Sequence, residues 1–220
     1  MAYVDFLSPL HKKTNRDYLA RMNAFPKAKA IEIAKQYGKD FWDGDRIFGY
    51  GGYHYDGRWK QIAEAMIKHY QIKPGQKILD VGCGKAFLLY EFQQLVPGLE
   101  VIGIDISEYA IEHAKKEVKP YLEVMDAAKL SFDDNSFDFV FSINTIHNLY
   151  CYDLEKALKE IERVGKNNKY IVIESYRNEQ EKVNMMCWVL TGECFFSIKE
   201  WEWWFSLTNY TGDYSFIFFE

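Results

Sequence analysis

The sequence is poor in cysteine and has no long apolar run, and each absence excludes a class of protein. Its four cysteines show neither C-x-x-C spacing nor paired histidines; they are Cys83, Cys151, Cys187 and Cys194. This pattern indicates neither a zinc site nor a disulfide framework, so we expect no metal and reduced thiols. No apolar stretch reaches 18 residues, and the first residues lack the apolar core of a signal peptide. We therefore expect a cytoplasmic protein without a membrane partner.

Excess positive charge is also missing. The formal net charge is −5, which argues against the broad phosphate contacts of a nucleic-acid-binding protein. The distribution is uneven, because residues 1–38 carry seven lysines or arginines and three acids, a local charge of +4. A basic segment of this kind is commonly just a solvated surface. The alternative that we keep is a segment that attracts an anionic substrate.

A third absence concerns one glycine of the dinucleotide-binding fingerprint, although the glycine-rich turn itself is present. The segment Asp80-Val81-Gly82-Cys83-Gly84 follows an apolar run, and Asp105 ends a second apolar run 25 residues after Asp80. The two glycines permit a tight turn that a ligand can approach, and a strand-end acid can accept hydrogen bonds from ribose hydroxyls. A dinucleotide fingerprint starting at Gly82 would need a third glycine at position 87, where the sequence has Phe87. The pattern predicts a nucleotide cofactor but disfavours a nicotinamide enzyme.

The acid and the glycines together resemble the first motif of the class I S-adenosyl-L-methionine-dependent methyltransferases, D/E-x-G-x-G-x-G, with Ala86 in place of the last glycine. Three further segments resemble the second, third and fourth strands of that family and follow in its order: Val101 to Ser107, Glu123 to Ala127, and Ser136 to Ser142 leading into Ile143 to Leu149. The resemblance covers residues 58–176 and implies a Rossmann-like fold with S-adenosylmethionine as the cofactor.

The resemblance also implies roles for individual residues. Asp80 would order the turn and support the methionine end of the cofactor, Asp105 would bind the ribose, and Asp126 would contact the adenine amino group. The implied cofactor-binding set is Asp80, Gly82, Cys83, Gly84, Asp105, Ile106, Asp126, Ala127 and Asn144. The alternatives are a turn without a ligand, solvated acids at 105 and 126, and a turn-capping amide at 144. The assignment requires a turn that the protein's own side chains leave open.

Candidate acceptor-side residues follow the fourth and fifth strands. His147 lies just beyond the fourth strand, and its imidazole titrates near neutral pH, so we expect a general base there, with a packed core histidine as the alternative. Glu174 and Arg177 would face the same crevice, and the planar fork of Arg177 would grip a phosphate or carboxylate unless it is simply a surface arginine.

A glycine- and aromatic-rich loop precedes the first strand. Several aromatic rings are costly to leave in water, so the segment 50–59 is expected to fold over the crevice as a lid. Tyr55 and Arg58 are the substrate-binding residues that we predict in it. The alternative is simple packing of the loop on the sheet edge.

The order of elements predicts an α/β fold with a doubly wound, mostly parallel sheet and an N-terminal helical cap. Predicted strands cover 78–81, 101–105, 122–125, 137–141, 170–173 and 214–219, and predicted helices include 15–22, 26–37, a helix with Asp153 as N-cap, and one opened by the capping box Ser197-x-x-Glu200. The family commonly ends in an antiparallel pair, which leaves the last strand open. We expect a cap and lid loop in residues 1–57 and the methyltransferase domain in residues 58–220.

The sequence also lacks a motif that marks one class of methyl acceptor. Methyltransferases for planar amino nitrogens of bases or glutamine typically carry N/D-P-P-Y/F after the fourth strand, whereas this sequence has Asn144-Thr145-Ile146-His147. The leading hypothesis is therefore methyl transfer to an oxygen or nitrogen of a small metabolite, with an anionic one, such as a phosphorylated compound or glycan precursor, favoured by the basic cap and Arg177. The alternatives are a protein or RNA methyltransferase and a non-catalytic S-adenosylmethionine-binding module. Trp203 suggests a subunit contact and hence a homodimer.

Overall fold

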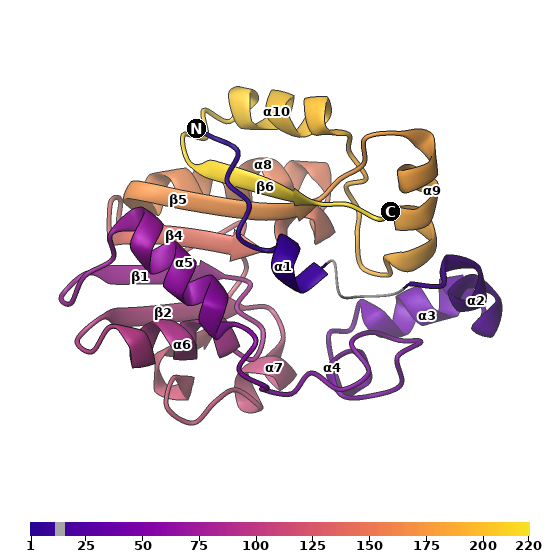
Figure 1. The fold of residues 1–220 in the computed structure, drawn as a ribbon, viewed down its shortest axis with the longest axis horizontal. Helices are drawn as coiled ribbons and strands as arrows, with labels where there is room; N and C mark the ends of the chain where they lie inside the picture. Colours follow the sequence, from indigo (N-terminus) through magenta and orange to yellow (C-terminus); the bar gives the residue numbers. More distant parts are fainter. Residues whose placement is uncertain (12–15) are drawn as a thin grey trace.

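Six parallel strands form one sheet at the centre of the protein, whose computed structural model describes residues 1–11 and 16–220 (Figure 1). The strands are β1 (Lys77–Val81), β2 (Glu100–Asp105), β3 (Leu122–Val124), β4 (Phe137–Ile143), β5 (Gly165–Glu174) and β6 (Asp213–Ile217). Their order is β3-β2-β1-β4-β5-β6, and every neighbouring pair is parallel. The predicted doubly wound sheet is confirmed, and its last strand is parallel to the others.

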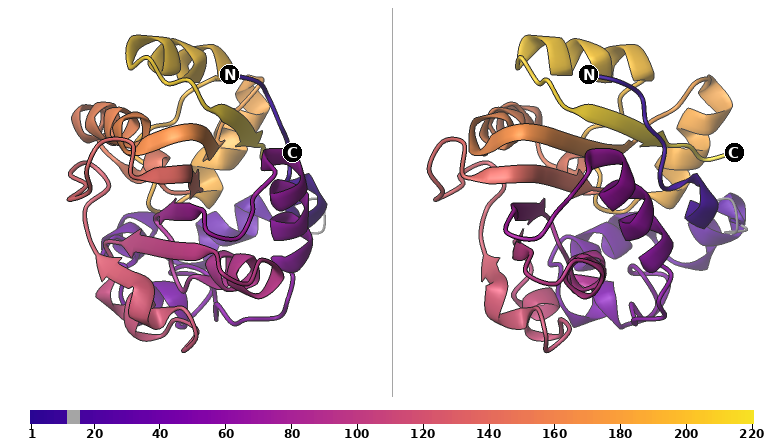
Figure 2. Two further views of the ribbon diagram at one scale, coloured as in Figure 1. Left: turned by 90° about the vertical axis from the view of Figure 1, so that its left-hand side faces the viewer. Right: turned by 60° about the vertical axis from the view of Figure 1, so that its left-hand side comes forward.

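Alternate side chains of the central strands point to opposite faces of the sheet, so each face has its own core. Phe139 and Phe141 of β4 pack on one side with α5 (Lys60–Tyr70) and α6 (Phe87–Leu95), while Val140 packs on the other side with α8 (Cys151–Val164) and α10 (Ile198–Leu207). Figure 2 shows the sheet between these two helix layers. The remaining connections contain α7 (Glu108–Glu112) and the short 3₁₀ helices η1 (Lys119–Tyr121) and η2 (Ile146–Asn148).

Two helix starts test the predicted caps. At α10 the capping box is confirmed, because the Glu200 carboxylate accepts the backbone N–H of Ser197 at 2.7 Å. The predicted start of α8 is wrong, because its N-cap is Tyr150 and Asp153 lies inside the first turn. A negative side chain is favourable there as well, since it faces the positive end of the helix dipole. The sequence signal of Asp153 therefore marked the first turn rather than the cap.

The first residues of the chain run beside β6. Tyr214 donates its backbone N–H to the carbonyl of Ala2 at 3.0 Å, and Val4 donates to the carbonyl of Tyr214 at 2.9 Å. The ring of Tyr3 also packs edge-on against the ring of Tyr214, with centroids 6.0 Å apart. Part of the outer edge of β6 is thereby covered, which nothing in the sequence predicted.

A group of helices lies at the carboxyl ends of the strands, near the arrowheads in Figure 1. The group consists of α1 (Ser8–His11), α2 (Tyr18–Ala24), α3 (Lys27–Ala34), α4 (Lys39–Trp42) and α9 (Glu179–Trp188). The N-terminal helices of the predicted cap are present, with α2 capped by Asp17, whose carboxylate accepts the N–H of Ala20 at 2.9 Å. Asn15, the predicted first residue of that helix, lies outside the described residues, as do Lys12 and Lys13.

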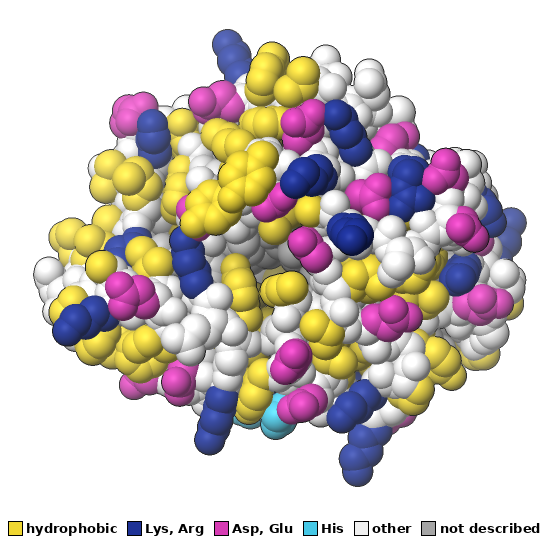
Figure 3. Space-filling model, turned by 180° about the vertical axis from the view of Figure 1, so that it is seen from behind, with side chains coloured by type: hydrophobic (Ala, Val, Ile, Leu, Met, Phe, Trp, Pro, Cys, Tyr) yellow, Lys and Arg dark blue, Asp and Glu magenta, His cyan; other side chains and the backbone are white. Residues whose placement is uncertain are grey.

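Figure 3 shows the face opposite to that of Figure 1, where Lys and Arg side chains are interspersed with Asp and Glu. This mixed pattern differs from the continuous basic surface that a phosphate backbone requires. Within residues 1–11 and 16–220, no helix is long and apolar enough to cross a membrane. The same residues contain no group of three or more His, Cys, Asp or Glu side chains that could hold a metal ion.

Candidate active site

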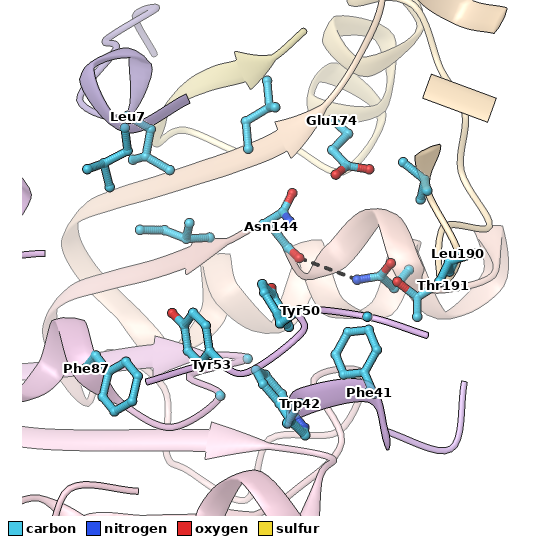
Figure 4. Close-up of a pocket in the computed structure, with 18 of the residues that line it drawn as sticks. Leu7, Phe41, Trp42, Tyr50, Tyr53, Phe87, Asn144, Glu174, Leu190 and Thr191 are labelled. Carbon is cyan, nitrogen blue, oxygen red and sulfur yellow. Dashed lines mark hydrogen bonds between the residues drawn. The ribbon is translucent and has the colours of Figure 1, made fainter. Parts of the chain in front are cut away.

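A cavity of about 500 Å³ opens at the carboxyl ends of β1 and β4, where the strand order reverses direction. In doubly wound sheets this is the position at which ligands bind. The walls come from the turn after β1, the segment after β4, the end of β5, the loop 49–59 and the cap. Figure 4 shows Asn144 and Glu174 on one side of this space, with the rings of Trp42 and Tyr50 on the opposite side.

The glycine turn after β1 has the conformation that its sequence predicts. The φ angle is +83° at Gly82 and +55° at Gly84, and Ala86, at the third glycine position of the motif, also has a left-handed φ of +56°. For an alanine this conformation costs about 1–2 kcal/mol. A Cβ atom on Gly82 would lie 2.2 Å from two side-chain atoms of Thr145. Both backbone angle and space therefore require glycine at position 82.

The two acids near the turn have different surroundings. Asp105 accepts the backbone N–H of Gly84 on Oδ2 at 2.7 Å and that of Ser107 on Oδ1 at 2.8 Å. Asp80 is 4% exposed and lines the cavity, and within the described part of the chain its carboxylate accepts no hydrogen bond. Burial, with a further contribution from the charge of Asp105, raises the pKa of Asp80 well above its usual range. Asp80 is a desolvated carboxyl group that faces a cavity.

The indole of Trp42, at the end of α4, covers part of the turn. A Cβ atom on Gly84 would lie 2.8 Å from this ring, and the indole Nε1 donates to Ser107 Oγ at 2.9 Å. The cavity still reaches residues 82–84, but it does not reach Asp105. The requirement for an open turn is thus met on the side of Asp80 and not on the side of Asp105.

An ion pair holds the loop that carries these aromatic rings. Lys85 is 3% exposed and donates to both carboxylate oxygens of Asp43, at 2.6 and 2.7 Å, and to the carbonyl of Tyr53 at 2.9 Å. Tyr109 donates to Asp43 Oδ2 at 2.9 Å. Partial burial of Asp43 acts to raise its pKa, but the bonds from Lys85 and Tyr109 outweigh this and lower it. The lid loop is therefore tied to the residue that follows the glycine turn.

Four residues beyond the strand ends carry buried polar atoms without a partner among the described residues. These atoms are Asn144 Oδ1, His147 Nδ1, Asn148 Oδ1 and Glu174 Oε2, and all four residues line the cavity. A buried polar atom without a hydrogen bond costs about 1–3 kcal/mol, so native proteins contain few of them. Their concentration at one cavity indicates a site for a polar ligand.

His147 is oriented by its neighbours. Its ring is almost fully buried, and Nε2 lies 3.2 Å from Glu174 Oε2, within ion-pair distance although not aligned for a hydrogen bond. Nδ1 is the nitrogen left without a partner. The hydroxyl of Tyr50 lies close to Asn144 and Glu174, and burial, reinforced by the Glu174 charge, raises the pKa of Tyr50 to about 12. A neutral tyrosine hydroxyl, an imidazole and a carboxylate thus meet beside the glycine turn.

Comparison with known proteins agrees with this geometry. A family model described as a methyltransferase domain matches residues 72–212. The chain belongs to the S-adenosylmethionine-dependent methyltransferases. The demethylmenaquinone methyltransferase of Symbiobacterium thermophilum is 34% identical over 128 residues, which cover 54% of this chain and 50% of that protein. Phosphoethanolamine N-methyltransferase 3 of Arabidopsis thaliana is 34% identical over 46% of this chain and 21% of its own length.

A solved structure shares the fold over a larger part of the chain. Phosphoethanolamine N-methyltransferase 2 of Haemonchus contortus, in complex with phosphomonomethylethanolamine and S-adenosylhomocysteine, superposes with a TM-score of 0.57 at 23% identity. The match covers 93% of this chain and 44% of that one. The chain spans half or less of the length of the curated relatives named above.

Not every predicted site residue of this methyltransferase lines the cavity. Arg177 pairs instead with Glu181 and Glu220, because Glu181 lies one helical turn further along α9 and captures the guanidinium. Tyr55 donates to Glu91 Oε1 at 2.7 Å, outside the cavity. Arg58 lines the cavity but is paired with Asp56. The predicted residues that do line it are Asp80, Gly82, Cys83, Gly84, Asn144, His147, Glu174 and Arg58.

The residues that we predicted to bind the adenosine part of the cofactor all lie outside the cavity. Asp105, Ile106, Asp126 and Ala127 do not line it. Ile106 is 58% exposed, and the Asp126 carboxylate accepts the N–H of Ala128 at 2.8 Å. Sequence reasoning missed Trp42 and the Asp43–Lys85 pair, whose residues carry no motif. The aromatic content of the neighbouring loop was the one signal that could have pointed to Trp42.

Proposed function

We propose that this chain transfers a methyl group from S-adenosylmethionine to an oxygen or nitrogen atom of a small metabolite. The observation that carries the proposal is one cavity with two kinds of unsatisfied group. Asp80 presents a desolvated carboxyl group beside the glycine turn, and Asn144, His147, Asn148 and Glu174 present unpartnered polar atoms on the segments after β4 and at the end of β5. The first suits a cationic donor and the second a polar acceptor.

The donor side fits S-adenosylmethionine in charge and shape. The cofactor supplies a methyl group on positively charged sulfur, and a buried carboxylate attracts a cation strongly because water does not screen it. The glycine turn lets a ligand approach the backbone closely. For the adenosine to reach Asp105, the ring of Trp42 has to leave Gly84. We therefore propose that the part of the cap that carries Trp42, which is α4 and the loop after it, moves when the donor binds.

The acceptor side fits a nucleophile that donates hydrogen bonds. Glu174 Oε2 and Asn144 Oδ1 are acceptors, so an amine or hydroxyl would satisfy them. His147 is the proposed general base, because proton transfer from the acceptor needs a basic group beside it, and the buried Nδ1 of this imidazole has no partner among the described residues. Glu174 is the proposed positioning residue, since it faces Nε2 and leaves Nδ1 as the free nitrogen.

The size and cover of the cavity favour a small acceptor. A volume of about 500 Å³ lies in the range of small-molecule sites, about 300–1,000 Å³. The cap closes over it, which leaves little room for a folded macromolecule. Relatives that carry the names demethylmenaquinone and phosphoethanolamine methyltransferase support a small-molecule acceptor. A cytoplasmic location and a homodimer through Trp203 remain proposals.

The test uses the full chain with methyl-labelled S-adenosylmethionine and a cell extract separated into small molecules, protein and RNA. We expect label in the small-molecule fraction, and mass spectrometry then identifies the product. Label confined to protein or RNA would overturn the small-molecule assignment. S-Adenosylhomocysteine binding in calorimetry without transfer to any fraction would favour a non-catalytic binding module.

A further inference from the structure

Three arginines from separate segments gather around one tryptophan at the cap side of the cavity. The guanidinium carbons of Arg16, Arg21 and Arg46 lie 5.6, 4.6 and 5.3 Å from the centroid of the Trp188 ring. Arg16 and Arg21 come from α2 and the residues before it, Arg46 from the segment between α4 and the lid loop, and Trp188 from the end of α9. All four residues line the cavity.

These arginines differ from the other arginines of the chain in having no counter-charge. Arg58, Arg163 and Arg177 each pair with at least one carboxylate. In residues 1–11 and 16–220, no Asp or Glu oxygen lies within 4.0 Å of a nitrogen of the cluster at positions 16, 21 and 46. Arg16 and Arg21 are half-buried and Arg46 is exposed. Like charges repel one another, so three guanidiniums without a counter-charge at one cavity wall call for an explanation.

Carbonyl oxygens hold the cluster in place without neutralising it. Arg21 donates to the carbonyls of Trp188 and Arg46 at 3.1 and 2.9 Å, and Arg46 donates to those of Gly49 and Tyr50 at 2.8 and 3.0 Å. The Nε atom of Arg16 is buried and has no partner among the described residues. The donors are thus fixed by the backbone, and some of them remain free.

The electrostatic consequence is mutual repulsion. Burial, and then the charge of Arg46, lowers the pKa of Arg21 to about 10. Burial also lowers the pKa of Arg46, with Arg16 acting in the same direction. All three side chains remain charged at neutral pH, so the wall carries a concentrated positive charge. An anion bound there would relieve the repulsion and accept the free N–H groups.

We propose that Arg16, Arg21 and Arg46 form the binding site for a phosphate group carried by the methyl acceptor. Three guanidiniums match a phosphomonoester dianion better than a single carboxylate, in charge and in the number of acceptor oxygens. The acceptor is then a small phosphate ester whose opposite end carries the amine or hydroxyl that is methylated beside His147. This inference rests on the proposed function, because it assigns the far end of the same acceptor.

One competing occupant has to be separated from a phosphate. S-Adenosylmethionine itself carries a carboxylate, and the arginines would hold it if the donor extended toward the cap. The two cases differ in what a variant does. Loss of a phosphate site weakens phosphate binding and leaves the affinity for S-adenosylhomocysteine unchanged, whereas loss of a donor site weakens S-adenosylhomocysteine binding.

The experiment is calorimetric titration of the full chain with inorganic phosphate, in the presence and absence of saturating S-adenosylhomocysteine. Arg16→Gln is the informative variant, because Arg16 has no carboxylate partner among the described residues and its Nε atom is buried without one. Arg21→Gln is the second variant, and Arg16→Lys restores the charge. Arg163→Gln, which removes an arginine paired outside the cavity, is the matched control. Thermal melts show whether each variant is folded.

We expect each Gln variant to weaken phosphate binding on the order of tenfold, Arg16→Lys to recover part of it, and Arg163→Gln to bind like the parent. The affinity for S-adenosylhomocysteine should stay unchanged throughout. Phosphate affinities equal to the parent in folded Arg16→Gln and Arg21→Gln would overturn the proposal, and so would a loss confined to S-adenosylhomocysteine. A parent chain that binds phosphate but no S-adenosylhomocysteine would instead refute the proposed function.

Discussion

Replacing Asp80 by asparagine should stabilise the protein and weaken donor binding at the same time. The side chain is 4% exposed, it accepts no hydrogen bond within the described residues, and burial raises its pKa. A group whose pKa is raised by folding contributes full stability below its unfolded pKa and loses that contribution as pH rises through the folded pKa. At pH 7 the parent therefore carries a carboxyl group whose ionisation folding disfavours. Asparagine removes the charge and keeps the shape.

The expected magnitudes follow from these surroundings. An unpaired buried charge costs more than a neutral amide, so Asp80→Asn should raise the free energy of unfolding at pH 7 by about 1 kcal/mol or more. The gain should shrink as pH falls toward 4, because the parent carboxyl is then protonated. Loss of the charge opposite the cationic sulfur of the donor should weaken S-adenosylmethionine binding by about 2 kcal/mol, which is about 30-fold in Kd.

Two measurements check this pair of effects. Urea unfolding between pH 4 and pH 8 without ligand gives the stability difference, and calorimetry with S-adenosylmethionine gives the affinity. Asp133→Asn, which changes an exposed aspartate far from the cavity lining, is the matched control and should alter neither. A variant that is less stable than the parent at pH 7, or that binds S-adenosylmethionine equally well, would refute the reasoning.

Three further changes have defined outcomes. Gly82→Ala should cost about 2 kcal/mol or more in urea unfolding, because φ is +83° and the new Cβ meets Thr145 at 2.2 Å. Gly57→Ala, also at positive φ but with open space around its Cβ, should cost less, and equal losses would show that the clash is unimportant. His147→Gln should slow methyl transfer about 100-fold or more while leaving S-adenosylhomocysteine affinity unchanged; a loss below tenfold would remove His147 as the base. Ser197→Ala breaks the capping box of α10 and should lower stability by about 1 kcal/mol, and an unchanged melting temperature would show that the cap is not needed.

The sheet was predictable because its strands are marked locally. Runs such as 78–81 and 101–105 are apolar, are buried on both faces, and end at glycine or acid. The start of β5 was not predictable in this way. Its first residues, Lys166 to Lys169, are polar, and they pair with β4 only because α8 ends directly at Gly165. Pairing across the sheet, rather than local composition, decides the conformation there.

The residues of the site also differ in whether local sequence or long-range packing determines their positions. The glycine turn and the residues after β4 are set by short-range sequence and were found from it. Arg16, Arg46 and Trp188 are far apart in the chain and meet only through the packing of α2 and the lid loop against α9. The sequence shows that Arg177 follows a strand, and on this basis we predicted that it binds substrate. It does not show that the carboxylate of Glu181 competes for the guanidinium. Long-range packing and local competition for charge are the two effects that a motif cannot report.

The backbone bonds between Ala2, Val4 and Tyr214 have a consequence for self-association. An unpaired strand at the rim of a sheet is a template for strands of other molecules, and β6 is rich in aromatic and β-branched side chains. The N-terminal residues occupy that template within the same molecule. Their removal would leave the amide and carbonyl of Tyr214 free to recruit a neighbour, so a shortened chain should lose solubility before it loses its fold.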